Sequence, residues 1–304
     1  MNNLSGRWKL GFLLALTAAV MWGLIPIALK GMLMLLDPIT TTFFRLSLAA
    51  AILTPLLVAT QQLPNRAKYL SPRLALRLLG TGVLVAGNYG LFCFGLEKTT
   101  PEAAEVMIQI APMLLLLAGL WVFKEPFSTA QWCGFGCFVF GLMLFFNHHL
   151  ADLFIAFNAY GVGLLMVAMS GLCWAGYGIS QKLLLREFNP QETMLAFYWI
   201  GALLLVPFCN FSPLADFDLW QLALLLSCGV ITLVAYGSFA ESLLHIEASR
   251  ASALIALSPL LTVAIMQLVP VWGLPAEPLG WLSLLGALMV VVGSMTTAIA
   301  TKAA

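Results

Sequence analysis

The chain has 304 residues, of which 62% are hydrophobic and only 9% are charged. Roughly a quarter of the residues of a soluble globular protein are charged, so this composition excludes that class. Fourteen Lys and Arg against thirteen Asp and Glu leave a net charge of +1, which excludes the strongly basic surface that nucleic acid requires. We therefore expect a polytopic membrane protein that is surrounded by the lipid bilayer.

Ten apolar stretches follow one another along the chain, each bounded by charged residues, Pro or Gly. An unpaired strand edge cannot face lipid, so we predict an all-α protein with ten transmembrane helices. These helices cover residues 10–29, 39–60, 76–97, 101–122, 128–147, 158–181, 193–209, 219–243, 249–270 and 279–299. Proline lacks a backbone N–H, and this lack costs least in the first turn of a helix. Helix starts are therefore predicted at or beside Pro38, Pro101, Pro126 and Pro190.

The second half of the chain repeats the first. A displacement of 152 residues aligns Gly163, Trp174, Lys182 and Pro190 with Gly11, Trp22, Lys30 and Pro38. A displacement of 147 residues aligns Gly229, Tyr236 and Pro259 with Gly82, Tyr89 and Pro112. We predict two five-helix repeats, residues 1–147 and 148–304. Because five is odd, the second repeat enters the membrane from the opposite side, and the two are inverted.

The basic residues predict the orientation of the chain. With the N-terminus in the cytoplasm, the outer loops hold only Lys30 and Lys98. The inner loops and tails hold eleven, namely Arg7, Lys9, Arg66, Lys68, Arg73, Arg77, Lys124, Lys182, Arg186, Arg250 and Lys302. Cytoplasmic loops carry such an excess, so we predict a bacterial inner-membrane protein with both termini in the cytoplasm.

The ordered set of these features resembles the drug/metabolite transporter superfamily, in its ten-span branch with two EamA-type repeats. The residues that carry the resemblance are Trp22, Trp174, Arg45, Pro112, Glu125, Pro126, Pro259, Glu277 and Pro278. Phe197 occupies the repeat position of Arg45, so any role of this Arg belongs to one half. The resemblance implies secondary transport of small metabolites, often export. It also implies a central cavity between helices one to four and six to nine, with helices five and ten outside.

Aromatic and polar residues at mid-membrane depth are candidates for substrate binding. Trp174, Tyr177 and Gln181 share one helix face, because they recur at i, i+3 and i+7. We predict a substrate site made of Trp22, Asn88, Tyr89, Gln109, Trp174, Tyr177, Gln181 and Tyr236. Packing between helices stays open as the alternative reading of these side chains.

Charged residues and prolines inside the spans are candidates for coupling or gating. Glu102 and Glu105 begin a polar face that either lines a water-filled path or stays solvated at the helix start. Arg45 either pairs with Asp37 or Glu105, or binds an anion. Prolines that free backbone groups in mid-membrane often mark hinges. The predicted set is Arg45, Glu102, Glu105, Pro26, Pro112 and Pro259.

Several remaining features indicate structural roles. Cys133, Cys137 and Gly141, with Gly286 and Gly293, give helices five and ten small-residue faces suited to close packing or to a dimer contact. His148 and His149 end helix five and are expected to be solvated. The six cysteines lie in apolar runs and indicate small buried side chains, so we expect no metal site and no disulfide.

We predict an alternating-access transporter for a small neutral or zwitterionic metabolite such as an amino acid, with export favoured. Efflux of aromatic or cationic drugs and a channel-like or non-transport membrane protein are the alternatives. The sequence lacks a phosphate-binding loop and has three His, so we expect neither ATP hydrolysis, a cofactor nor enzyme activity. Protons are the candidate coupling ion, and monomer and homodimer stay open.

Overall fold

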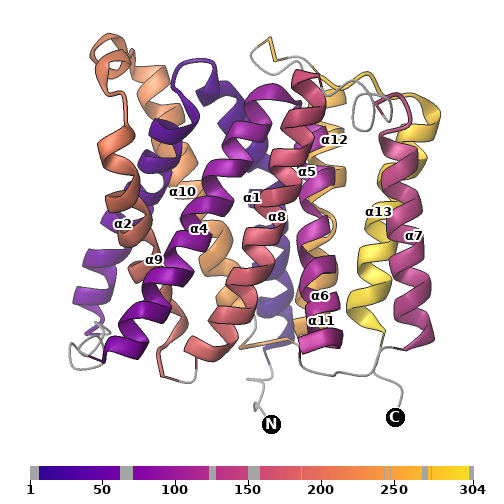
Figure 1. The fold of residues 1–304 in the computed structure, drawn as a ribbon, viewed down its shortest axis with the longest axis horizontal. Helices are drawn as coiled ribbons and strands as arrows, with labels where there is room; N and C mark the ends of the chain where they lie inside the picture. The colour runs from indigo at the N-terminus through magenta and orange to yellow at the C-terminus, as the bar shows by residue number, and fades with distance from the viewer. Residues whose placement is uncertain are drawn as a thin grey trace.

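The computed structural model describes residues 7–61, 71–122, 128–149, 158–185, 187–242, 244–246, 248–268, 273–274 and 276–300. In these ranges the chain is a bundle of helices without strands (Figure 1). The α-helices are α1 (Trp8–Leu33), α2 (Pro38–Ala59), α4 (Pro72–Lys98), α5 (Pro101–Ile108), α6 (Ile110–Val122), α7 (Thr129–Phe145), α8 (Ala159–Leu184), α9 (Pro190–Leu205), α10 (Leu219–Ser242), α11 (Ala248–Ile255), α12 (Ser258–Leu268) and α13 (Trp281–Ile299). The short 3-10 helices η2 (Val206–Phe208) and η3 (Ser212–Asp216) follow α9.

Eight helical stretches of the described chain are long and apolar enough to cross a membrane, and α7 is a shorter apolar helix. The predicted span 101–122 is divided into α5, with 8 residues, and α6, with 13, which meet at Gln109. A second division separates α11 from α12. Pro112 and Pro259 follow these divisions by three residues or fewer. Proline lacks an N–H and clashes with the preceding helical turn, which explains why the helices break there.

Prolines begin several helices, as predicted, and a side-chain cap also precedes α2. Pro38, Pro101 and Pro190 each lie in the first turn of a helix. Asp37 accepts hydrogen bonds from the backbone N–H groups of Ile39 and Thr40, both at 2.9 Å, and thereby caps α2. The predictions for Pro126, Glu125, Arg66, Lys68, Lys124, Arg186 and Lys302 lie outside the described residues, as does the side chain of Lys182.

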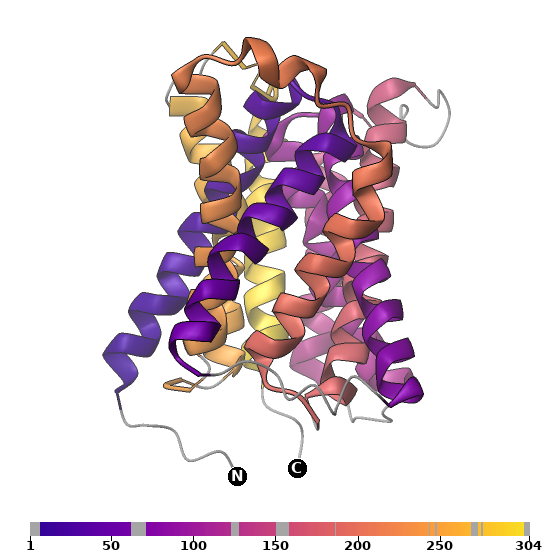
Figure 2. The same ribbon diagram turned by 90° about the vertical axis from the view of Figure 1, so that its left-hand side faces the viewer.

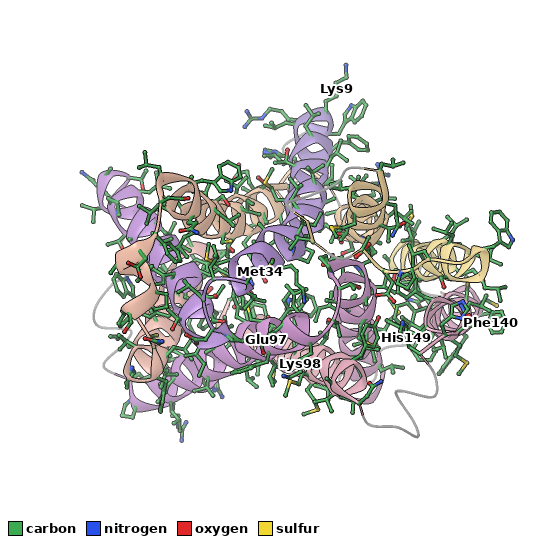
Figure 3. All side chains as sticks on the ribbon, turned by 90° about the horizontal axis from the view of Figure 1, so that it is seen from above. Lys9, Met34, Glu97, Lys98, Phe140 and His149 are labelled. Carbon is green, nitrogen blue, oxygen red and sulfur yellow. The ribbon has the colours of Figure 1, made fainter. Side chains whose placement is uncertain are left out.

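Helix α1 begins and α13 ends at the same face of the bundle, which we call the N face, and the opposite face is the far face (Figure 1). Lys9, Arg73 and Arg77 lie near helix starts at the N face, whereas Lys30 and Lys98 lie near helix ends at the far face. Figure 3 looks onto the far face, with Lys98 among the labelled residues. These five described basic residues therefore lie on the two faces to which the sequence analysis assigned them.

Helix packing repeats between the two halves. α1 packs on α10 and α4 packs on α8, while α2 lies between α10 and α9 (Figures 1 and 2). A Cβ on Gly11 would lie 2.7 Å from His245, and a Cβ on Gly163 would lie 2.8 Å from Lys98. Likewise, a Cβ on Gly82 would lie 2.6 Å from the side chain of Ile200, and a Cβ on Gly229 would lie 2.6 Å from the side chain of Leu48. Each of these contacts is the repeat image of its partner, with the displacements found in the sequence.

Helices α7 and α13 form a separate pair at one end of the bundle (Figures 1 and 3). Their backbones are close enough that a Cβ on Gly286 would lie 2.3 Å from the backbone N of Phe145. Gly134 and Gly293 face each other at a second close contact between the two helices. The predicted glycines and Cys137 therefore lie where the two helices pack against each other within one chain, whereas Cys133 is exposed and its predicted place in this buried face is wrong. Phe140, on α7, points away from the bundle (Figure 3) and is 55% exposed.

Candidate functional site

An aromatic pocket lies among α4, α8, α9 and α10, and it contains five of the eight residues predicted to bind substrate. Its lining consists of Val85, Asn88, Tyr89, Trp174, Tyr177, Met194 and Tyr236. The space between these side chains is about 240 Å³, part of it open to solvent. The cavity itself has a volume of about 10 Å³, room for about one water molecule, whereas sites that hold a drug-sized ligand occupy roughly 300–1,000 Å³. The pocket is therefore contracted in this conformation.

Aromatic rings dominate the walls of the pocket. The rings of Tyr89 and Tyr236 stack with their centres 6.2 Å apart, and those of Trp174 and Tyr177 meet edge to face at 6.3 Å. Trp22 contacts the ring of Tyr236 at 5.3 Å but does not itself line the pocket. The repeat mates Trp22 and Trp174 therefore differ, because one forms the wall and the other supports it.

Two predicted polar residues are held by neighbouring helices. The side-chain amide of Asn88 donates to the backbone oxygen of Ser170 at 2.9 Å and to its hydroxyl at 2.8 Å, which joins α4 to α8. Asn88 thus both packs and lines the pocket. Gln181 donates to the Thr193 hydroxyl at 3.1 Å and is not part of the pocket lining. The helix face that carries Trp174 and Tyr177 therefore leaves the pocket before it reaches Gln181.

Arg45 makes no ion pair with a described acidic residue, so the predicted pairing with Asp37 or Glu105 is wrong. Asp37 instead caps α2. The guanidinium carbon of Arg45 lies 4.2 Å from the centre of the Tyr89 ring, and its Nε donates to Thr232 at 2.7 Å. Arg45 is only 6% exposed. The chain therefore buries a cation next to a residue that lines the pocket.

The polar face of α5 is covered by the second half of the chain. Glu105 accepts a hydrogen bond from the Ser258 hydroxyl at 2.7 Å, and Gln109 donates to the same hydroxyl at 3.4 Å. Glu102 is fully buried and accepts from the backbone N–H of Glu277 at 3.0 Å. The expectation that Glu102 stays solvated at the helix start is wrong, and in this conformation no described part of this face forms an open path.

The three predicted hinge prolines differ in their effect on the helices. Pro26 lies inside the uninterrupted helix α1, whereas Pro112 and Pro259 lie beside the two helix divisions. The backbone oxygen of Gly23, in the turn before Pro26, accepts a hydrogen bond from the Thr262 hydroxyl at 2.7 Å. α1 therefore packs against the start of α12, close to the hydrogen bond between Ser258 and Glu105.

The sequence analysis did not predict a polar cluster that lies at the far face of the bundle. Glu277 accepts hydrogen bonds from the hydroxyls of Thr100 and Tyr160, the latter at 2.9 Å, and its other oxygen lies 2.8 Å from Nε2 of His149. His149, expected to be solvated, is thus bound to a buried carboxylate. In the sequence, Glu277 stands out only because Glu277 and Pro278 repeat Glu125 and Pro126 of the first half. Its three partners lie more than a hundred residues away, and no local pattern joins them.

Comparison with known proteins identifies the family. Residues 9–147 and 161–299 each match the EamA-like transporter family. The chain belongs to the EamA-like transporter family. The two matches place this EamA-like chain in the drug/metabolite transporter superfamily.

Relatives of this EamA-like chain carry transporter names. It is 34% identical over 293 residues to the uncharacterized inner membrane transporter YhbE of Escherichia coli K12, covering 95% of this chain and 91% of that protein. It is 33% identical to an uncharacterized transporter of Haemophilus influenzae, covering 96% of each. A probable amino-acid metabolite efflux pump of Escherichia coli K12 is 24% identical, covering 92% of each. The chain is therefore a membrane transporter.

A solved structure shares this fold. A crystal structure described only as that of a protein superposes with a TM-score of 0.64 at 17% identity, covering 95% of this chain and 98% of that one.

Within the described residues, no group of three His, Cys, Asp or Glu side chains is placed to hold a metal ion.

Proposed function

We propose that the chain is a ten-span secondary transporter that exports a small neutral or zwitterionic metabolite, such as an amino acid, by alternating access. It has no enzymatic role in this proposal. The ten spans comprise α1, α2, α4, α5 with α6, α7, α8, α9, α10, α11 with α12, and α13. The observation that carries the proposal is the aromatic pocket, which draws walls from both EamA repeats.

The reciprocal contacts support an inverted arrangement of the repeats 1–147 and 148–304. Gly11 meets His245 where Gly163 meets Lys98, and α7 meets its own repeat mate α13. A two-fold axis in the membrane plane relates inverted repeats and generates such pairs of contacts. Two halves built alike on opposite sides of a pocket can rock about it and expose it to each side in turn.

The pocket chemistry supports the class of cargo. Aromatic walls take an apolar side chain, while the Asn88 amide and the tyrosine hydroxyls supply a few polar contacts. The name of the 24% identical relative, a probable amino-acid metabolite efflux pump, favours an amino-acid-like cargo. In this proposal Trp22 supports the pocket, Gln181 joins the pocket helices α8 and α9, and Gln109 joins the division between α5 and α6 to α12, outside the pocket.

Glu105 and Glu102 are the candidates for proton coupling. Both are buried acids on α5, and an ionisable residue inside a span costs several kcal/mol unless it has a partner or a function. Glu105 touches α12 through Ser258, beside the division that Pro259 follows. A change in the protonation of Glu105 would therefore act on the hinge regions near Pro112 and Pro259.

We also propose that the N face is cytoplasmic in a bacterial inner membrane. The division of basic residues between the two faces and the name of the inner membrane relative YhbE support this orientation. Fusion of a fluorescent cytoplasmic reporter and, separately, of a periplasmic phosphatase after Ala304 tests it. Fluorescence without phosphatase activity is expected, and the reverse result overturns the topology.

Efflux of cationic or aromatic drugs is the second candidate, and the aromatic walls are the observation that favours it, since cations bind to ring faces. The buried charge of Arg45 beside Tyr89 opposes it.

Proteoliposome transport separates the candidates. Vesicles loaded with each of the 20 standard amino acids are tested for counterflow of the same labelled compound, with and without a pH gradient, beside a panel of cationic dyes. Saturable counterflow of at least one amino acid supports the proposal. Counterflow of the dyes alone transfers support to drug efflux, and flux that neither saturates nor shows counterflow indicates a channel.

A further inference from the structure

Arg45 has hydrogen-bonding capacity that the described chain does not use. A guanidinium group has five N–H donors, whereas the described residues offer Arg45 only the Thr232 hydroxyl, at 2.7 Å from Nε, and the Cys93 thiol, a weak acceptor. No described carboxylate lies within ion-pair distance of it. The side chain is nevertheless 6% exposed and lies about 11 Å, or seven residues, inside the start of α2. A buried cation of this kind is costly without a counter-charge.

The side chains around Arg45 also offer donors without acceptors. The hydroxyls of Tyr89 and Tyr198 are buried and have no hydrogen-bond partner in the described part of the chain. Both tyrosines belong to one buried cluster, they are 3% and 1% exposed, and both lie within reach of the charge of Arg45. A buried hydroxyl without a partner loses its hydrogen bonds to water and gains nothing in return. Guanidinium and hydroxyl groups that lack acceptors favour the binding of an anionic group that accepts from all of them.

Tyr89 connects this donor cluster to the aromatic pocket. Its ring contacts the Arg45 guanidinium on α2 and stacks with Tyr236, and Tyr89 and Tyr236 both line the pocket. Thr232, the partner of Arg45, lies one helical turn from Tyr236 on the same face of α10. A ligand with its apolar part against the aromatic walls can therefore direct a polar end past Tyr89 toward Arg45.

We propose that Arg45, with the Tyr89 and Tyr198 hydroxyls, forms a carboxylate-binding subsite, and that the cargo is a small zwitterionic amino acid with an aryl or alkyl side chain. This inference rests on the proposed transport function and narrows it, because the carboxylate becomes the required group. The guanidinium donates two parallel hydrogen bonds to the two carboxylate oxygens, a geometry that a neutral amide cannot match. Phe197 stands at the repeat position of Arg45, so the subsite exists in one half only and sets a single orientation of the ligand.

Two probes that differ only in the proposed group test the subsite. 3-Phenylpropanoate carries a carboxylate and 3-phenylpropanamide is its neutral counterpart. Their binding to the detergent-purified full chain is measured by calorimetric titration and by the shift of the thermal unfolding midpoint. We expect the carboxylate to bind roughly ten- to hundredfold more tightly than the amide, since charge-assisted hydrogen bonds are the strong class. Arg45→Gln should remove that preference while leaving the weak binding of the amide in place.

Control variants separate recognition from folding. Arg77→Gln removes an exposed cation at the N-face end of α4 and should keep the preference for the carboxylate. Tyr89→Phe removes only a hydroxyl that has no described partner, so it should fold like the wild type and bind the carboxylate more weakly. If Arg45→Gln does not fold, the Tyr89→Phe result decides.

The outcomes separate this inference from the transport function. The subsite is overturned if the two probes bind equally or if neither binds. It is also overturned if Arg45→Gln keeps the preference for the carboxylate or, where that variant does not fold, if Tyr89→Phe keeps it. Counterflow of an amino acid that persists when the two probes bind equally leaves the transport function standing without the subsite. Arg45-dependent carboxylate binding without counterflow of any solute leaves the subsite standing without transport.

Discussion

The hydroxyl of Ser258 donates a hydrogen bond to Glu105 at 2.7 Å, and this bond joins the start of α12 to α5 across the two halves of the chain. Both residues are buried, and each lies beside a helix division, at Gln109 for α5 and immediately before α12. An acid whose partner belongs to the other half responds to any movement of one half against the other. This relationship makes Glu105 the first residue to test.

Glu105→Gln should keep the fold and disturb transport. The amide oxygen of Gln can still accept from Ser258, so we expect the free energy of unfolding to change by less than about 1 kcal/mol. A neutral side chain cannot exchange a proton, so transport should be abolished or lose its pH dependence. Transport across a pH series and thermal stability in the same preparation measure the two effects.

The control for Glu105 is Glu97→Gln, which neutralises an exposed acid 3.7 Å from Lys98 and should leave transport unchanged. The double variant Glu105→Gln with Arg45→Gln should show stability losses that add to within about 1 kcal/mol, because the two residues feel each other's charge but form no ion pair. Normal transport with normal pH dependence in Glu105→Gln removes the coupling role.

Cysteine labelling should separate the pocket wall from its support. In a cysteine-free background, Trp174→Cys and Tyr177→Cys should react with a small polar thiol reagent, because both positions line the pocket. Trp22→Cys should react more slowly, since Trp22 lies behind Tyr236. Labelling rates followed by mass spectrometry measure the difference.

Met169→Cys is the matched control, because Met169 lies on the same helix and is 51% exposed on the outside of the bundle. It should react poorly with a polar reagent in lipid. Reaction rates at Trp174 and Tyr177 no higher than at Met169 would place the aromatic face against lipid.

The adjacent histidines at the end of α7 should differ in their effect on stability. His149 lies 2.8 Å from the Glu277 carboxylate, whereas His148 is exposed. His149→Ala should lower the free energy of unfolding by about 1–3 kcal/mol, because it deprives a buried carboxylate of a partner. His148→Ala should stay within about 0.5 kcal/mol of the wild type. Thermal unfolding of the two variants decides, and equal midpoints contradict the role assigned to the far-face cluster.

The seam between α7 and α13 should reject even one methyl group. Gly286→Ala would place a Cβ 2.3 Å from the backbone of Phe145, and backbone atoms cannot move away cheaply. We expect a loss of roughly 1–3 kcal/mol, as overpacking costs. Gly136→Ala on α7 meets nothing within 4 Å and should be neutral or slightly stabilising. Similar unfolding midpoints for the two variants would show that the helices separate readily.

The sequence alone determined most of the helices, their repeat and part of the pocket, but not the two divisions within the predicted spans. An apolar stretch in lipid has to satisfy its backbone groups within itself, so composition decides where a helix lies. Periodicity then placed Trp174 and Tyr177 on one face, and the pocket indeed uses that face. The repeat was visible because corresponding residues, such as Tyr89 and Tyr236, keep their spacing along the chain.

Only the tertiary structure decided which polar groups meet. Sequence reasoning offered Arg45 an acidic partner, but the packing of α2 against α10 gives it Thr232, 187 residues away. Glu105 receives Ser258, 153 residues away, and Glu277 receives Tyr160 across 117 residues. Residue spacing orders side chains around a single helix, whereas a contact between helices depends on their crossing angle and rotation. Those quantities come from the packing of whole helical surfaces, and no local pattern encodes them.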